Sequence, residues 1–169
     1  MGSYLSLPIL ALAAAIQASI LPQIRFWDGT PDLVFLLVLG WAIHAPLDEG
    51  IVWAIVGGIL QDLLSVAPVG ISSVGMILVV YATYRVAQQL QRVGPFFIAL
   101  LVLSGSLVQQ ITLWLLFAAF GFTVDFLDDF TYVITPTIIY NFVLMWPTYW
   151  LLRKIQRRVQ NVRRSITLD

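Results

Sequence analysis

Long stretches without a charged side chain fill most of this chain. They cover residues 1–24, 33–47, 50–61, 63–84, 93–124 and 130–152. A helix needs about 20 mostly apolar residues to cross roughly 30 Å of hydrocarbon, so stretches of this kind predict helices embedded in a membrane. Turn and capping signals divide them into six helices.

Proline, glycine and acidic residues mark the ends of these helices. The clearest start is Thr30-Pro31-Asp32, an N-cap hydroxyl followed by a proline at the first helical position and an acid in the first turn. A second such pair, Thr135-Pro136, opens the last helix. The six predicted helices cover approximately residues 4–21, 31–45, 48–66, 72–91, 95–120 and 135–152.

The predicted helices differ in length. The helix over 31–45 spans only about 22 Å at 1.5 Å per residue, less than the hydrocarbon core, so neighbouring helices must shield it. The helix over 95–120 reaches about 39 Å. These unequal lengths predict a compact, irregular bundle of six transmembrane helices, an all-α integral membrane protein.

A small element precedes the last helix. Between Asp125 and Ile134 the apolar residues share one helical face, and Asp125, Asp128 and Asp129 lie on the other. This pattern predicts either a separate interfacial helix or an early beginning of the sixth helix.

The composition supports a membrane protein and excludes several kinds of chemistry. Of the 169 residues 60% are hydrophobic and 11% charged, against about 25% charged in soluble domains. There is no cysteine and one histidine, which excludes disulfides, thiolate nucleophiles and multi-histidine metal sites. Without a nucleophile–base pair or a phosphate-binding loop, we expect no enzyme, no cofactor, no metal and no nucleic acid.

The basic residues predict the orientation in the membrane. Eight of the nine lie inside if both termini are cytoplasmic, with Arg25 alone outside. The acidic group Asp125, Asp128 and Asp129 then faces the exterior, where it could meet a partner. The prediction is therefore a multi-pass membrane protein with both termini in the cytoplasm, a six-helix domain over 1–152 and a basic tail over 153–169.

The tail combines an apolar stripe with a basic cluster. Ile155, Val159, Val162 and Ile166 follow one helical face. The surrounding basic residues are Arg153, Lys154, Arg157, Arg158, Arg163 and Arg164. Such a segment binds either anionic lipid on the cytoplasmic leaflet or a cytoplasmic protein.

Asp62 lies within an apolar helix, where an acid is costly and suggests a role. Counting residues from the helix ends places several polar side chains at a similar depth, in the outer half of the membrane. The predicted polar cluster comprises Asp62, Gln61, Gln17, Gln109, Gln110 and Arg25. Asp62 could cap the following turn through backbone N–H groups, pair with Arg25, contact a partner, or take part in proton or solute binding.

Two groups of residues resemble the MreD family of bacterial rod shape-determining membrane proteins. The first combines Pro31-Asp32-Leu33 and Trp41 with Gly50, Gly57-Gly58, the run Gln61-Asp62-Leu63-Leu64-Ser65, Pro68 and Gly70. The second is Leu144-Met145-Trp146-Pro147 followed by Leu151-Leu152-Arg153-Lys154. Residues 94–134 carry no matching motif.

The resemblance implies a non-enzymatic scaffold of the cell elongation machinery. Members of this family associate with the one-helix membrane protein MreC. Together they connect MreB filaments to the RodA glycosyltransferase and a class B penicillin-binding protein, and so to peptidoglycan synthesis. The family's fold looks like that of the substrate-binding subunits of energy-coupling-factor transporters, which leaves a vitamin-type binding subunit as the alternative.

Overall fold

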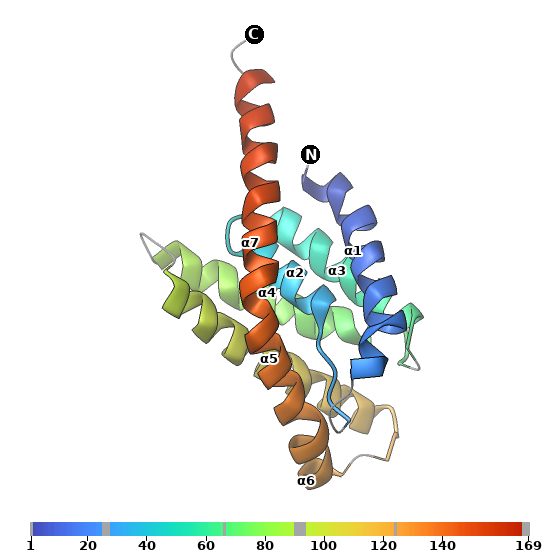
Figure 1. The fold of residues 1–169 in the computed structure, drawn as a ribbon. Helices are drawn as coiled ribbons and strands as arrows, with labels where there is room; N and C mark the ends of the chain where they lie inside the picture. The colour runs from blue at the N-terminus through green and yellow to red at the C-terminus, as the bar shows by residue number, and fades with distance from the viewer. Residues whose placement is uncertain (1, 25–27, 66, 90–93, 124, 167–169) are drawn as a thin grey trace.

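The computed structural model describes residues 2–24, 28–65, 67–89, 94–123 and 125–166, which form helices and turns without a strand. The helices are α1 (Gly2–Ser19), the 3-10 helix η1 (Leu21–Ile24), α2 (Leu33–Ala42), α3 (Leu47–Leu63), α4 (Ile71–Gln89), α5 (Pro95–Ala119), α6 (Phe126–Asp129), the π-helix η2 (Phe130–Ile134) and α7 (Thr135–Ile166). Figure 1 shows α2 near the centre, with α7 running across the bundle. The all-helical prediction is confirmed.

Two of the described helices, α4 and α5, are long and apolar enough to cross a membrane. The apolar helices over Ser6–Ser19 and Leu33–Ala42 are shorter. Six transmembrane helices, and the likeness to energy-coupling-factor subunits, therefore stay predictions.

The short helix α2 forms the core, as its length predicted. All its residues from Val34 to Ala42 are buried, and it packs against α1, α3, α4 and α7. Trp41 of α2 stacks on Trp53 of α3 with ring centroids 4.3 Å apart. Its N-cap is Asp32, whose carboxylate accepts the Phe35 N–H. The expected Thr30 cap is wrong, because Asp32 provides the acceptor nearer to the free N–H groups.

Paired small residues predict close helix packing, and this packing is observed at Gly57-Gly58. A Cβ atom on Gly58 would overlap the Ser73 backbone of α4, and one on Gly57 would lie 3.0 Å from the side chains of Val34 and Val38. The absence of side chains at these two positions lets α3 approach both α2 and α4.

The last helix begins before Thr135-Pro136. Helices α6, η2 and α7 follow one another without a gap, so the early beginning left open by the sequence is the observed one. Proline has no N–H to bond the carbonyl four residues earlier, that of Tyr132. This carbonyl instead accepts the Asp28 N–H at 3.2 Å, and the Thr135 N–H bonds back five residues to Phe130. Pro136 is thus accommodated inside the helix beside a π-turn.

The predicted end of the sixth helix at Leu152 is also wrong. Helix α7 continues to Ile166, and its C-terminal part extends beyond the rest of the bundle (Figure 1). Residues 153–166 contain no glycine or proline, and arginine, lysine and glutamine favour helix. The separation of residues 1–152 from the tail 153–169 stays a prediction.

Candidate functional site: a polar network and an adjoining cavity

The polar network in the bundle is centred on Asp32. One carboxylate oxygen accepts the Phe35 N–H at 3.0 Å and Gln17 Nε2 at 3.3 Å. The other accepts Gln61 Nε2 at 3.1 Å. Gln17 also accepts the Val34 N–H at 3.1 Å through Oε1. Asp32 is only 4% exposed, and these neutral donors solvate it in place of water.

The network continues through the backbone of Asp32 into α7 and α5. The Asp32 N–H donates to Asn141 Oδ1 at 2.8 Å, and Asn141 Nδ2 donates to Ser106 Oγ at 3.1 Å. Asn141 and Ser106 are each 1% exposed. Five elements, α1, α3, α5, α7 and the segment before α2, therefore meet in one set of hydrogen bonds.

Asp62 caps the turn between α3 and α4. Its Oδ2 accepts the Gly70 N–H at 2.7 Å and the Ser72 N–H at 3.1 Å. Gly70 has φ +101°, a backbone conformation that glycine adopts without strain. Of the roles left open for Asp62, backbone capping is the one observed. Within the described part of the chain, its Oδ1 has no hydrogen-bond partner.

The prediction that Asp62 is the centre of the polar cluster is wrong. Gln17 and Gln61 bond to Asp32 rather than to Asp62. Gln61 and Asp62 are neighbours on α3, and successive helical side chains point about 100° apart, so they reach different elements. Gln109 of α5 lies nearer to Asp62, since its Nε2 donates to the Ser72 carbonyl at 3.4 Å.

Two members of the predicted cluster are not joined to it. Gln110 is half-buried, and no hydrogen bond links it to the described members. Arg25 lies outside the described residues, so its pairing with Asp62 stays a prediction.

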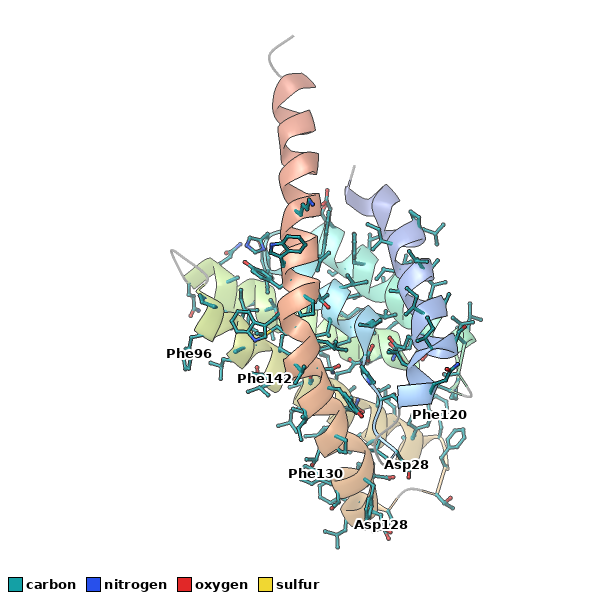
Figure 2. All side chains as sticks on the ribbon, viewed as in Figure 1. Asp28, Phe96, Phe120, Asp128, Phe130 and Phe142 are labelled. Atoms are coloured by element: carbon teal, nitrogen blue, oxygen red, sulfur yellow. The ribbon has the colours of Figure 1, made fainter. Side chains whose placement is uncertain are left out.

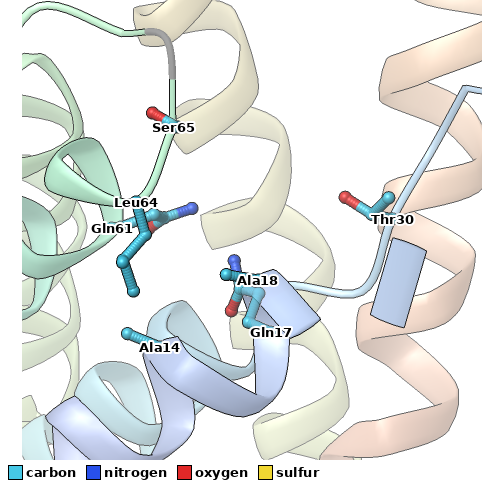
Figure 3. Close-up of a pocket in the computed structure, with 7 residues that line it drawn as sticks. All are labelled: Ala14, Gln17, Ala18, Thr30, Gln61, Leu64 and Ser65. Atoms are coloured by element: carbon cyan, nitrogen blue, oxygen red, sulfur yellow. The ribbon is translucent and has the colours of Figure 1, made fainter. Parts of the chain in front are cut away.

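A cavity of about 310 Å³ adjoins the network, between the end of α1, the end of α3 and residue Thr30. Its lining residues are Ala14, Gln17, Ala18, Thr30, Gln61, Leu64 and Ser65, and Figure 3 shows them converging from three parts of the chain. Gln61 Oε1 is buried without a partner in the described structure. The polar side chains in the lining, Gln17, Thr30, Gln61 and Ser65, make the cavity suited to a small polar group.

The remaining residues of the family motif are mostly structural. Pro31, Trp41 and Gly58 are buried, and Ser65 donates its hydroxyl to the Asp62 carbonyl. Trp146 is 52% exposed and Pro147 lies inside α7. Among the described residues there is no group of His, Cys, Asp or Glu that could hold a metal ion.

The acidic surface predicted outside the membrane combines acids with exposed apolar side chains. Asp125 caps α6 by accepting the Leu127 N–H at 3.1 Å, and Asp128 is exposed. Leu127 is 75% and Phe130 41% exposed. Figure 2 shows Asp128 and Phe130 at the same end of the molecule. Asp129 is half-buried, so the surface offers the two exposed acids Asp125 and Asp128 and an apolar patch.

Lys154 Nζ, at the start of the basic tail, lies 5.4 Å from the ring centroid of Trp150 and makes a cation–π contact with it. The positions of Arg153, Arg157, Arg158, Arg163 and Arg164 are given by the helical backbone alone.

Asn141 and Ser106 belong to the network, although neither was predicted as a site residue from the sequence. An amide within the otherwise apolar stretch 130–152 was the available signal, because polar groups inside membrane helices find partners there.

Comparison with known proteins identifies the family. No curated protein and no solved structure matches the chain significantly. Residues 1–159, which include the Asp32 network, the Asp62 cap and the acidic surface, match the family of rod shape-determining protein MreD. The chain therefore belongs to the MreD family, and its function is in rod shape determination.

Proposed function

We propose that this chain is a non-enzymatic scaffold of the elongation machinery in the bacterial cytoplasmic membrane. It spans the membrane six times with both termini inside. An MreC-type partner binds it on the exterior, and the complex helps couple MreB filaments to peptidoglycan synthesis by RodA and a class B penicillin-binding protein.

The surface around α6 carries this proposal. Asp125 and Asp128 stand beside Leu127 and Phe130, all of them exposed. An apolar patch rimmed by charge is typical of a site where another protein binds. The buried polar groups support a rigid platform rather than a reaction centre, because Asp32 and Asp62 are both held by backbone and amide donors.

The test is recovery of a one-helix partner with this protein from its native membrane in mild detergent, followed by mass spectrometry. We expect the partner and cell-wall synthases with the wild-type chain. Reversal of Asp125 and Asp128 to lysine should lower partner recovery. Asp48→Lys is the matched control, since Asp48 is also exposed but begins α3, at the opposite side in the proposed topology.

Unchanged recovery after the α6 reversals would place the partner elsewhere. Asp62, for which a partner contact was one of the roles left open by the sequence, serves as an independent probe. Asp62→Asn keeps an acceptor for the two N–H groups, so it should leave recovery unchanged if Asp62 acts only as a cap.

The cavity favours a second candidate, a small-solute binding subunit of a transporter. Its volume of about 310 Å³ and its polar lining residues Gln17, Thr30, Gln61 and Ser65 would suit a small polar molecule. A stoichiometric solute in the same purification, lost on Gln61→Leu and accompanied by an ATPase module, would support this candidate against the scaffold.

A further inference from the structure

Residues 153–166 form an arm of α7 that extends beyond the bundle. The face that α7 buries in the bundle continues along this arm in the same register. Inside the bundle this face holds Asn141, Met145 and Leu152, all buried, and Thr148, half-buried. In the arm the same register passes through Ile155, Val159, Val162 and Ile166. The steps along the whole series alternate between four and three residues, which is the a/d pattern of a coiled coil.

The backbone supports this register. Helix α7 is unbroken to Ile166, and its end stands clear of the other helices (Figure 1). The apolar positions of the arm therefore form a seam of about three turns, placed where a second helix can lie alongside.

The residues next to the seam exclude a second copy of the chain. With Val159 at an a position, Arg158 occupies g and Arg163 occupies e, the positions that face the other helix. Two copies in the same membrane orientation project this part of α7 in the same direction, because the helix has no break, so their seams can pair only in parallel. Parallel pairing would place Arg158 opposite Arg163 of the second copy, and the two charges repel. Residues 153–166 contain no acid to relieve this repulsion, so the seam fits a helix with acidic flanks.

A lipid surface fits the arm less well. Helices that lie on membranes bury Trp, Phe or Leu, whereas this seam consists of isoleucine and valine. The tryptophans at this end, Trp146 and Trp150, precede the arm. The arm would also have to bend near Arg153 to lie in the membrane plane, and α7 has no break there.

We propose that residues 155–166 of α7 bind one helix of another protein as a two-stranded coiled coil. The partner helix has aliphatic a and d positions and acidic e and g positions. This inference deepens the proposed scaffold function by giving it a docking segment at the C-terminal end of α7. The pairing itself depends only on α7.

The test uses the full-length protein in phosphatidylcholine nanodiscs and a fluorescent peptide of about three heptads, with isoleucine at a, leucine at d and glutamate at e and g. Anisotropy should show saturable binding to the wild-type protein. The same peptide with lysine at e and g should not bind. Arg158→Glu together with Arg163→Glu should lower the affinity for the glutamate peptide by at least about tenfold. The same double variant should bind the lysine peptide.

The matched control is Arg157→Glu together with Arg164→Glu. It changes the net charge equally, but these residues lie at f, on the outer side of the arm. We expect the glutamate peptide to lose much less affinity with this control. Equal losses with both pairs would overturn the proposal, because they would show unspecific attraction between charges.

Two further outcomes would also overturn it. Since the chain has no cysteine, Val159→Cys gives a single site for cross-linking or spin labelling. Rapid cross-linking between two copies without peptide would assign the seam to a dimer. Burial of the label among headgroups in phosphatidylglycerol nanodiscs, with no peptide binding, would assign it to the membrane. Failure to recover a one-helix partner while the peptide still binds would count against the proposed function alone.

Discussion

The backbone N–H of Asp32 donates to Oδ1 of Asn141 over 2.8 Å, which joins the segment before α2 to the N-terminal part of α7. The same segment makes two more contacts with the continuous helix formed by η2 and α7. Thr30 N–H donates to Thr137 Oγ1 at 3.3 Å, and Asp28 N–H donates to the Tyr132 carbonyl at 3.2 Å. Together they align residues 28–32 along α7 and hold the Asp32 carboxylate where α1 and α3 also reach it.

The first prediction concerns the Asp32 carboxylate. Asp32→Ala should destabilise the protein by about 2–4 kcal/mol, because it leaves the buried donors of Phe35, Gln17 and Gln61 without their acceptor. Asp32→Asn should cost much less. Its amide would face Gln61 Nε2, but Gln61 can turn its unpartnered Oε1 towards the new donor. Thermal unfolding in mild detergent measures both.

Asp48→Ala is the control for this pair, since Asp48 is an exposed acid. Its unfolding midpoint should stay close to that of the wild type. If Asp32→Asn destabilised the protein as much as Asp32→Ala, the negative charge itself would be needed, and the network would be more than a set of neutral hydrogen bonds.

The second prediction separates the cap at Asp62 from an ion pair with Arg25. Asp62→Ala should cost about 2–3 kcal/mol, because the N–H groups of Gly70 and Ser72 lose their acceptor. Adding Arg25→Ala should restore little of this stability. Substantial recovery in the double variant would show that Arg25 had been left as an unpaired charge, and the cap would then be only part of the role of Asp62.

The sequence predicted the short shielded helix and the packing glycines because both depend on local patterns. An apolar stretch of limited length must be covered by its neighbours, and paired glycines favour close helix contact. These features appear in α2 and at Gly57-Gly58. The capping of the α3–α4 turn by Asp62 was also among the expected alternatives.

The centre of the polar network could not be found in this way. Gln17 and Gln61 were grouped with Asp62 because their predicted depth in the membrane is similar. Which carboxylate each side chain reaches depends on how its helix is rotated about its own axis, and depth does not give this rotation. Asp32 was interpreted only as part of a helix start, and its bond to Asn141 joins residues 109 positions apart. At Pro136 the tertiary contact from Asp28 satisfies the carbonyl that proline leaves free, so a local start signal occurs inside a continuous helix.

The third prediction tests the close approach of α3 and α4. Gly58→Ala should destabilise the protein by about 2 kcal/mol or more, because the new Cβ atom would overlap the Ser73 backbone and the helices must separate. Gly94→Ala is the matched control, since a Cβ atom there meets nothing within 4 Å. Unfolding midpoints of the two variants should differ clearly. Similar midpoints would mean that α4 can shift without loss of packing.

The last prediction tests the alignment of residues 28–32 on α7. A Cβ atom on Gly29 would lie 2.5 Å from Pro136 Cβ and 2.9 Å from the Thr137 backbone nitrogen. Gly29→Ala should therefore push this segment away from α7. Because the chain has no cysteine, Thr30→Cys with Thr137→Cys provides a single pair whose cross-linking reports the distance. Oxidation should join the pair readily in the otherwise unchanged chain and much more slowly with Gly29→Ala. Equal rates would show that the segment is held by Asp32 and Asn141 alone, and that the contact at Gly29 is not required.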